Sequence, residues 1–220
     1  MVGSKQTGHY QFAFQETLSR FKLMDPVEIA AKSGTKYNSD TSSFTVQSFN
    51  HDIKVSFPDG RITFAGTDIL PLMGWRLVII NYLVRADGTP LSRRLISYKE
   101  LENGMVFYAN FYSNNIMGLA RRIKGISPEK LAEAYDKLGA KFRDGADLAV
   151  VVPALPKFPI TIKIWFPDEE LPGSANILFD ASANSYLHTE DISVISGYAV
   201  AFPLLEYKIL SGLPWRKTVL

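Results

Sequence analysis

One group of polar residues lies in a short turn, residues 85–90, directly after a long apolar stretch. Arg85, Asp87 and Thr89 place a cation, a carboxylate and a hydroxyl close together, and such a set could bind a polar ligand at the mouth of a pocket. The same residues also suit a structural role. An arginine can cover the last carbonyls of a helix, and Asp87 followed by glycine can form a tight turn. We retain the turn as a candidate ligand-binding segment.

A second group of polar residues, 180–191, connects an apolar segment to the last helix that the sequence predicts. Loops at such junctions commonly carry binding residues. The candidates are Asp180, Thr189, Glu190 and Asp191, whose carboxylates could hold a cation or accept hydrogen bonds from a ligand. In the structural alternative, Thr189 caps the helix and the two acids after it favour the positive helix end. Because these acids occupy that end, we do not expect an anionic ligand.

Residue types that usually hold a metal or attack a substrate are scarce. The chain has no cysteine, and His9, His51 and His188 are far apart in the sequence. It contains no glycine-rich nucleotide-binding motif, no zinc-protease motif and no serine-hydrolase motif. We therefore predict no bound metal and no cofactor, and the sequence identifies no catalytic residue. An enzyme that uses Asp87, Asp180 and Asp191 as acid, base or cation ligands is an alternative.

Aromatic residues recur four positions apart at 107–112. Phe107 and Phe111 would share one side of a helix, as would Tyr108 and Tyr112. These rings could stack on a planar ligand. Aromatics at this spacing are more often part of a core, which is the interpretation that we prefer.

The composition is that of an ordinary globular protein, with 46% hydrophobic and 21% charged residues. A formal net charge of +2 is too small to predict a nucleic-acid partner. The first residues lack a signal-peptide pattern, and the apolar segment 192–205 is shorter than a membrane span and contains Pro203. We expect a cytoplasmic protein without a membrane partner, in which 192–205 belongs to a buried helix.

The chain alternates groups of helices with groups of strands. Apolar residues at helical spacing predict helices at 9–22, 27–32, 69–84, 107–124, 128–138 and 190–205. Period-two patterns and apolar runs predict strands at 44–49, 53–57, 61–64, 148–152, 160–166 and 175–179. Strict strand–helix alternation is missing, so we predict an α+β fold with a mostly antiparallel sheet packed against several helices. Residues 1–220 should form a single domain, with 1–22 a peripheral helix.

The two candidate segments are expected to meet in space. The helices 69–84 and 190–205 are the most apolar in the chain, so both should pack centrally. If they are antiparallel neighbours, the end of the first meets the beginning of the second. Arg85 would then reach Glu190 or Asp191.

Several segments resemble a known but uncharacterised family. They lie at residues 23–30, 55–60, 82–91, 96–101, 178–180 and 186–192, and the most specific are L-V-R-A-D-G-T-P at 83–90 and T-E-D-I at 189–192. Together these segments resemble the domain of unknown function 3786, over nearly the whole chain from about Leu23 to Ala201.

The resemblance implies a setting rather than a reaction. Proteins of this family occur chiefly in anaerobic bacteria and archaea, and some join the domain to a cysteine-rich iron–sulfur module. An accessory or ligand-binding role in anaerobic redox or corrinoid-linked metabolism is therefore expected, with an iron–sulfur or corrinoid protein as partner. A structural subunit of a larger complex is a further alternative. The family pattern more often has proline where this chain has His188.

Overall fold

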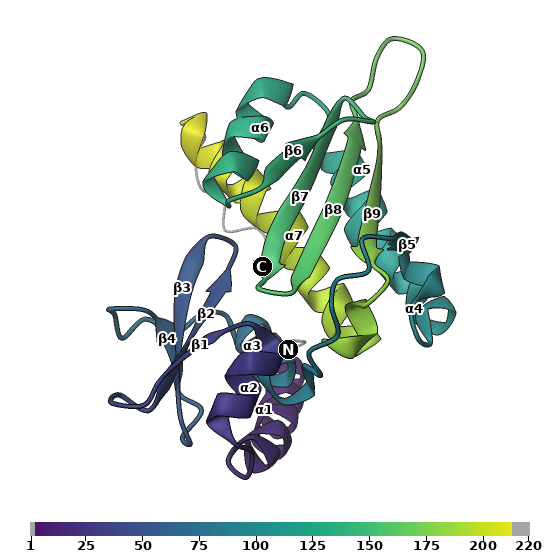
Figure 1. The fold of residues 1–220 in the computed structure, drawn as a ribbon. Coiled ribbons are helices and arrows are strands. Elements are labelled where there is room, and N and C mark those ends of the chain that lie inside the picture. Colours follow the sequence, from purple (N-terminus) through teal and green to yellow (C-terminus); the bar gives the residue numbers. More distant parts are fainter. Residues whose placement is uncertain (1–2, 213–220) are drawn as a thin grey trace.

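The protein is an α+β structure in which helices pack against two antiparallel sheets, as the computed structural model shows (Figure 1). The structure describes residues 3–212, with side chains described from Gln11 onward. The candidate histidine His9 therefore lies outside the described side chains. The predicted fold class is confirmed, although the strands form two sheets rather than one.

The first part of the chain forms two helices and a four-stranded sheet. Helix α1 (Gly3–Phe21) packs on α3, and the short helix α2 (Pro26–Ser33) follows. Asp25 caps α2, since its carboxylate accepts hydrogen bonds from the backbone of Val27 at 2.7 Å and of Glu28 at 3.1 Å. The sheet has the order β1-β2-β3-β4, built from β1 (Lys36–Asn38), β2 (Ser43–Ser48), β3 (His51–Ser56) and β4 (Ile62–Phe64).

Helix α3 (Met73–Arg85) begins four residues later than its apolar pattern predicted. Pro71 disfavours the helical conformation at the residue before it. Ile69 and Leu70 are also well exposed, so burial does not draw this segment into the helix. The prediction of a helix from 69 was therefore wrong at its start and correct at its end.

The middle of the chain contains a helix that changes its pitch. Strand β5 (Leu95–Ser97) leads through a short 3-10 turn (Tyr98–Glu100) into α4 (Gly104–Phe111), a π-helical turn (Tyr112–Ile116) and α5 (Met117–Arg122). Phe111 and Ile116 are both buried although they are five residues apart. A π-helical turn places residues at this spacing on one side of the helix. The uniform helix predicted at 107–124 was wrong for this reason.

The second sheet is five-stranded and antiparallel, in the order β5-β9-β8-β7-β6. Helix α6 (Pro128–Lys137) precedes β6 (Lys141–Arg143), β7 (Leu148–Leu155), β8 (Phe158–Trp165) and β9 (Ser174–Asp180). Every second residue of β8 from Ile160 to Ile164 is fully buried, as the period-two pattern predicted. Figure 1 shows α7 running diagonally across one side of this sheet.

Helix α7 (Thr189–Leu210) is the longest helix, and it follows a 3-10 turn (Ala183–Ser185). Its length and composition would suit a membrane span. Its buried residues instead form a stripe at helical spacing, namely Ile192, Ile195, Ser196, Ala199, Val200, Pro203 and Leu204. The stripe packs in the protein core, so one face of α7 is buried as the sequence predicted, while 33% of its apolar stretch as a whole is buried.

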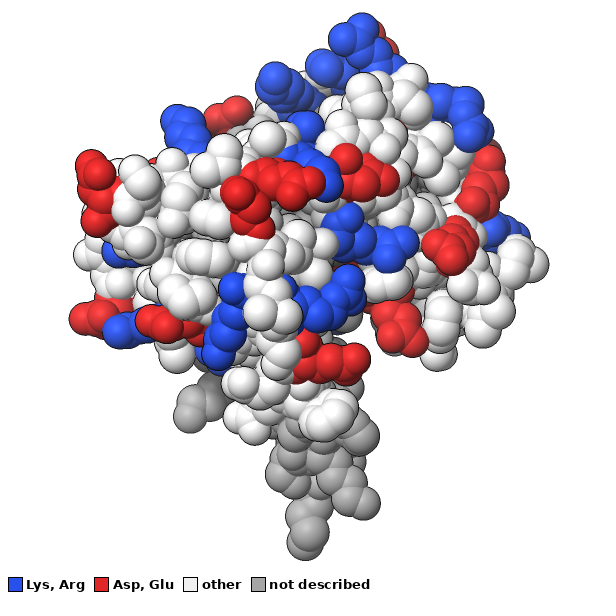
Figure 2. Space-filling model, turned by 60° about the horizontal axis from the view of Figure 1, so that its bottom comes forward, with Lys and Arg blue, Asp and Glu red and all other residues white. Residues whose placement is uncertain are grey.

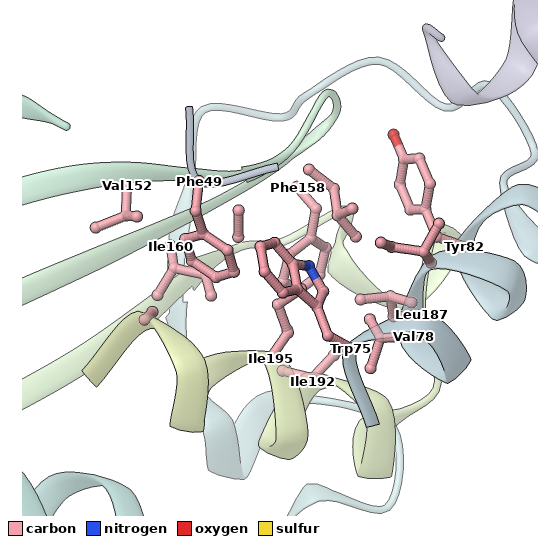
Figure 3. Packing of buried hydrophobic residues seen from close by; sticks show 14 of the residues in the cluster. Phe49, Trp75, Val78, Tyr82, Val152, Phe158, Ile160, Leu187, Ile192 and Ile195 are labelled. Carbon is pink, nitrogen blue, oxygen red and sulfur yellow. The ribbon is translucent and has the colours of Figure 1, made fainter. Parts of the chain in front are cut away.

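The two sheets share one hydrophobic cluster with α3 and α7. Phe49 and Trp75 lie close to Ile160, Ile192 and Ile195 in this cluster (Figure 3). Ser48 links the parts directly, because its hydroxyl donates to the carbonyl of Ala154 at 2.6 Å and accepts from the Trp75 indole at 2.9 Å. On the surface in Figure 2, acidic and basic side chains are interspersed, so that face carries no continuous basic area.

Candidate functional site

A small cleft opens at the N-terminal end of α7. It has a volume of about 190 Å³ and is lined by Glu102, Asn103, Phe107, His188, Thr189 and Glu190. The first two residues lie in the connection before α4, Phe107 lies on α4, and the other three lie at the beginning of α7. Asn103 has a φ of 57°, a left-handed conformation that asparagine tolerates better than most residues. The cleft is therefore built by two segments that are far apart in the sequence, 102–107 and 188–190.

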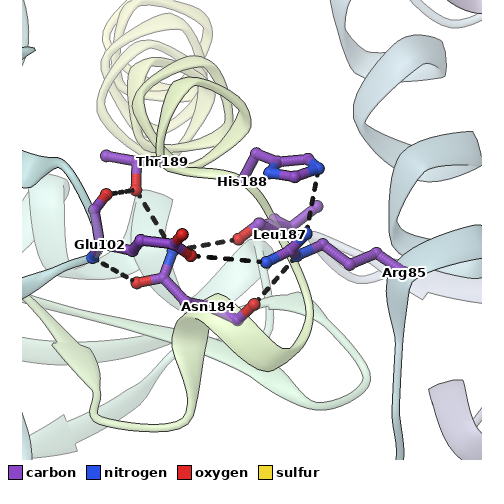
Figure 4. Close-up of polar contacts among 6 residues, drawn as sticks. All are labelled: Arg85, Glu102, Asn184, Leu187, His188 and Thr189. Carbon is purple, nitrogen blue, oxygen red and sulfur yellow. Dashed lines mark hydrogen bonds and ion pairs between the residues drawn. The ribbon is translucent and has the colours of Figure 1, made fainter.

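Arg85, the last residue of α3, joins these segments together (Figure 4). Its Nε donates to the carbonyl of Asn184 at 2.9 Å, and its Nη1 lies 3.0 Å from Nε2 of His188. Its Nη2 lies 3.7 Å from the Glu102 carboxylate. The two candidate segments therefore do meet, as predicted. The direct contacts described for Arg85 are with Glu102, Asn184 and His188 rather than with the predicted Glu190 or Asp191, although its positive charge also acts to lower the pKa of Asp191.

His188 occupies the N-cap position of α7 and faces the cleft. Burial and the positive charge of Arg85 lower its pKa. The imidazole is therefore neutral at pH 7, and Nε2 accepts the hydrogen bond from the guanidinium. This fixes the tautomer, with the proton on Nδ1. The uncharged His188 imidazole, with Nδ1–H as its hydrogen-bond donor, therefore lies at the rim of the cleft.

Thr189 does not cap α7, in contrast to the structural alternative from the sequence. It is the first residue of the helix, and its hydroxyl donates to the carbonyl of Glu102. Asn184 completes this link, since its Oδ1 accepts from the Glu102 backbone at 2.8 Å and its Nδ2 donates to the Thr189 hydroxyl at 3.2 Å. The prediction failed because a distant carbonyl, rather than the helix backbone, lies within reach of the hydroxyl. Thr189 positions the wall of the cleft that contains Glu102.

Asp87 and Thr89 stabilise their own turn. The Asp87 carboxylate accepts from the backbone of Thr89 at 2.8 Å, and hydrogen bonds from Thr89 hold its pKa below the usual range. The Tyr186 hydroxyl donates to the carbonyl of Thr89, and the backbone of Asp87 donates to Ser185 at 3.3 Å. The turn is thereby attached to the loop that leads into α7. These contacts favour a positioning role over direct ligand binding.

Asp180 is buried, and its carboxylate is already occupied by protein donors. Its oxygens accept hydrogen bonds from backbone and hydroxyl groups of Ser92 and Ser182 and from the backbone of Arg93, at 2.7–2.9 Å. Burial raises the pKa of this carboxyl, but the hydrogen bonds from Ser182 and Ser92 outweigh it and hold the value at about 2. Asp180 therefore closes a loop, with four of these hydrogen bonds on Oδ1 and one on Oδ2.

Asp191 is buried in the first turn of α7 and is directed toward α3. Its Oδ1 accepts from the Asn81 amide at 3.0 Å, and Asn81 in turn accepts from the Thr17 hydroxyl of α1 at 2.7 Å. Burial raises the pKa of Asp191 to about 6, and the hydrogen bond from Asn81 opposes this rise only in part. Among residues 11–212, this carboxyl is not one of those that line the cleft.

The cleft can bind a small polar molecule through several kinds of contact. Glu102 and Glu190 accept hydrogen bonds and attract positive charge, Asn103 both donates and accepts, and the Phe107 ring offers an apolar surface. Within the described side chains, no group of three histidines or acids is arranged to hold a metal ion. The two carboxylates make the arrangement better suited to a neutral or cationic ligand than to an anion.

Four lining residues escaped the sequence analysis as site residues: Glu102, Asn103, Phe107 and His188. Phe107 was assigned to the core with its neighbours. Phe111 does lie in the core, where its ring stacks on that of Tyr98 with 3.9 Å between the ring centroids, but Phe107 is only half-buried. The capping box of Ser97 and Glu100 is the one local signal in this segment, and it predicts the 3-10 turn rather than the cleft beside it.

The comparison with known proteins agrees with the family resemblance. A family model described as Domain of unknown function (DUF3786) matches residues 25–202. No curated protein and no solved structure matches the chain. The matched region begins after α1 and contains the whole cleft, its Arg85 support and both candidate segments. The chain therefore belongs to the DUF3786 family.

Proposed function

We propose that this protein binds a small polar molecule, neutral or cationic, in the cleft at the beginning of α7. The observation that carries the proposal is the way the cleft is built. Arg85 bridges two distant segments, contacting Glu102 on one and Asn184 and His188 on the other, while burial and the charge of Arg85 lower the pKa of His188, whose Nε2 is already bonded. Such fixed polar groups around a small cavity are typical of ligand sites.

The size of the cleft limits what the ligand can be. About 190 Å³ is less than the 300–1,000 Å³ that drug-sized ligands and cofactors commonly need. A corrin ring or a dinucleotide is therefore not proposed for this cleft. We instead propose that any link to anaerobic redox or corrinoid-linked metabolism runs through a protein partner, an iron–sulfur or corrinoid protein of the cytoplasm. The family resemblance supports this setting.

An enzymatic role is the second candidate, and the observation in its favour is the Asp191 carboxyl, whose pKa of about 6 suits a general acid or base. Its hydrogen bond to Asn81 directs it away from the cleft. A binding role is preferred because the residues that line the cleft are separate from this carboxyl.

The proposal is tested by screening the purified protein for thermal stabilisation by small amines, amino acids, amides and polyols. A compound that binds is then titrated by calorimetry against the wild type, Phe107→Leu and Glu190→Gln, with the exposed Glu133→Gln of α6 as a matched control. We expect roughly tenfold weaker binding for the two cleft variants, which corresponds to the loss of one good contact, and unchanged binding for the control. Failure of all four compound classes, or equal binding by all variants, would contradict the proposal.

The proposed partner requires a separate measurement. Capture by the tagged protein from an anaerobic lysate should enrich a protein with the visible absorbance of an iron–sulfur cluster or a corrinoid. Capture of colourless proteins alone would contradict this part of the proposal and leave the ligand measurement unaffected.

A further inference from the structure

A second groove, mainly apolar, lies between the four-stranded sheet, the beginning of α3 and the second half of α7. It has a volume of about 340 Å³, larger than the cleft described above and within the 300–1,000 Å³ that small-molecule sites commonly have. Of the ten described residues that line it, eight are apolar and two are polar, namely His51 and Glu206. The groove is therefore large enough for a small ligand with an apolar body.

Packed aromatic rings give this groove a fixed shape. The Trp75 ring lies 5.0 Å from that of Phe202 and 5.8 Å from that of Phe64, measured between ring centroids, and the ring planes are inclined by 52° and 74°. Trp75 is only 3% exposed, and its indole N–H donates to the Ser48 hydroxyl at 2.9 Å. Because packing and this hydrogen bond hold Trp75 in place, the groove does not need a ligand to form it.

The segment before α3 leaves apolar surface of the groove in contact with water. Leu70 is 50% exposed and Leu72 is 38% exposed, and both line the groove. Apolar surface gathered in this way commonly marks a ligand-binding groove. The apolar body of a ligand displaces water from these side chains when it binds, and this displacement favours binding.

Helix α7 gives the groove a negative charge. Phe202 is followed by Leu205 three residues later and by Glu206 four residues later, so all three lie on the same side of the helix. Among the described residues that line the groove, Glu206 is the only aspartate, glutamate, lysine or arginine, and its side chain is 25% exposed. A positive group bound by this carboxylate therefore lies close to the Phe202 ring, and the faces of aromatic rings attract cations.

Lys137, the last residue of α6, already pairs with this carboxylate. Its Nζ lies 3.1 Å from Oε1 of Glu206. The Lys137 side chain is 46% exposed, and exposed ion pairs contribute little because water screens the charges. The ammonium group of a ligand can therefore replace Lys137 at Glu206 or share the carboxylate with it.

We propose that this groove binds a small organic amine. Its protonated ammonium group pairs with Glu206, and its aromatic or branched aliphatic body lies against Phe202 and Leu72. An organic acid is disfavoured because its carboxylate would lie beside that of Glu206, and a neutral compound gains only the apolar contacts. The groove shares no described lining residue with the cleft at the beginning of α7, so this proposal does not depend on the function proposed for that cleft.

The first test compares three compounds that share an apolar body and differ in the head group, namely phenylpropylamine, phenylpropanol and phenylpropanoate. Each compound is titrated into the full chain by calorimetry at neutral pH. We expect the amine to bind about tenfold more tightly than the alcohol, because it adds the contacts of the ammonium group with Glu206 and Phe202. The carboxylate should bind most weakly. Equal affinities, tightest binding of the carboxylate, or no binding of any of the three overturns the proposal.

The second test changes the charges at the groove. Glu206→Gln should weaken binding of the amine about tenfold, to the level of the alcohol, and leave binding of the alcohol unchanged. Lys137→Met should tighten binding of the amine by about two- to threefold, since it removes the competing ammonium group. Glu169→Gln, in the exposed turn after β8, is the matched control and should change neither affinity. Amine binding that Phe107→Leu weakens and Glu206→Gln does not would assign the compound to the cleft and overturn the proposal.

The third test concerns the apolar wall. Leu72→Ser should weaken the amine and the alcohol by the same factor, because it removes a contact with the body that the two compounds share. Leu171→Ser is the matched control, since Leu171 is 66% exposed in the connection between β8 and β9. Circular dichroism establishes that the variants are folded. Sedimentation that finds a dimer for the wild type and a monomer for Leu72→Ser would assign the groove to a second copy of the chain and overturn the proposal.

Discussion

At the scale of single residues, the two buried carboxylates have opposite electrostatic surroundings. Asp180 accepts five hydrogen bonds, which outweigh burial and hold its pKa at about 2, whereas burial raises the pKa of Asp191 to about 6 and the hydrogen bonds from the Asn81 amide and the His188 backbone offset this only in part. Both residues had been candidates on equal terms. The number of donors around each carboxylate decides that one closes a loop and the other titrates near neutral pH.

Asp191 should make stability depend on pH. The pKa of the Asp191 carboxyl is 3.8 in the unfolded chain and about 6 in the folded protein, so the folded state binds the proton more tightly. The contribution is therefore fully present below about pH 4 and is lost as the pH rises through about 6. Asp191→Asn should remove this dependence. Between pH 4 and pH 7 the wild type should lose roughly 2.5 kcal/mol of unfolding free energy relative to the variant.

Chemical denaturation of both proteins at pH 4, 5, 6 and 7 measures this difference. Because the comparison is made between pH values, any constant effect of the substitution cancels. Parallel pH profiles of the wild type and Asp191→Asn would contradict the assignment.

Thr189 should matter through its contact with Glu102 rather than as a cap. Thr189→Ala removes the donor to a partly buried carbonyl, and we expect a loss of roughly 1–3 kcal/mol of unfolding free energy. Thr189→Ser keeps the hydroxyl and should restore most of it. His188→Ala should cost less, since no cap hydrogen bond from the His188 side chain is found in the described structure. Chemical denaturation measures both losses of unfolding free energy, and a larger loss for His188→Ala than for Thr189→Ala would contradict this assignment.

At the scale of elements, the junction of the 3-10 turn with α4 depends on close packing at Gly104. Gly104 is the first residue of α4. A Cβ atom there would lie 1.9 Å from the carbonyl oxygen of Tyr98, which is far too close for any side chain. This contact fixes the segment that carries Glu102 and Asn103.

Gly104→Ala should therefore destabilise the protein strongly and displace this wall of the cleft. Gly118→Ala is the matched control in α5, where a Cβ atom would meet the Ser113 carbonyl at an ordinary 3.8 Å. There alanine should stabilise the helix by about 0.5–1 kcal/mol. Chemical denaturation measures the change in unfolding free energy, which should fall for Gly104→Ala and rise for Gly118→Ala. Similar changes for both substitutions would contradict the packing argument.

At the scale of the whole molecule, the two sheets share a core. Ser48 bonds to Ala154 and Trp75, and the backbone of Phe49 donates to the carbonyl of Pro153 at 3.0 Å. Helix α1 adds to this unit through Thr17 and Asn81, although it lies outside the region matched by the family model. We therefore expect the predicted single domain to unfold as one cooperative unit.

Unfolding should accordingly be a single transition. Tryptophan fluorescence and far-ultraviolet circular dichroism should give coinciding denaturation curves, because Trp75 lies where the two sheets meet. Ser48→Ala should shift both curves together, by roughly 1–3 kcal/mol, since it leaves the Trp75 N–H and the Ala154 carbonyl without this partner. Two separate transitions would indicate two domains.

The local elements of this protein follow from its sequence. Asp25-Pro26 and Gly34 predict the limits of α2, and the alternating residues 160–166 predict β8, because caps and period-two patterns depend on residues close in the chain. The α+β class follows from the order of these elements. The proximity of the two candidate segments follows from the burial that two very apolar helices require.

Only the tertiary structure decides which polar residues face the cleft. Thr189 lies next to a carbonyl supplied by residue 102, and Asp180 is surrounded by donors from residues 92 and 93, far away in the sequence. Phe107 lines the cleft while Phe111 is buried, because the π-helical turn changes which side of the helix meets the core. Hydrogen-bond partners and burial are properties of the folded arrangement, so identical carboxylates and rings in the sequence take different roles in the protein.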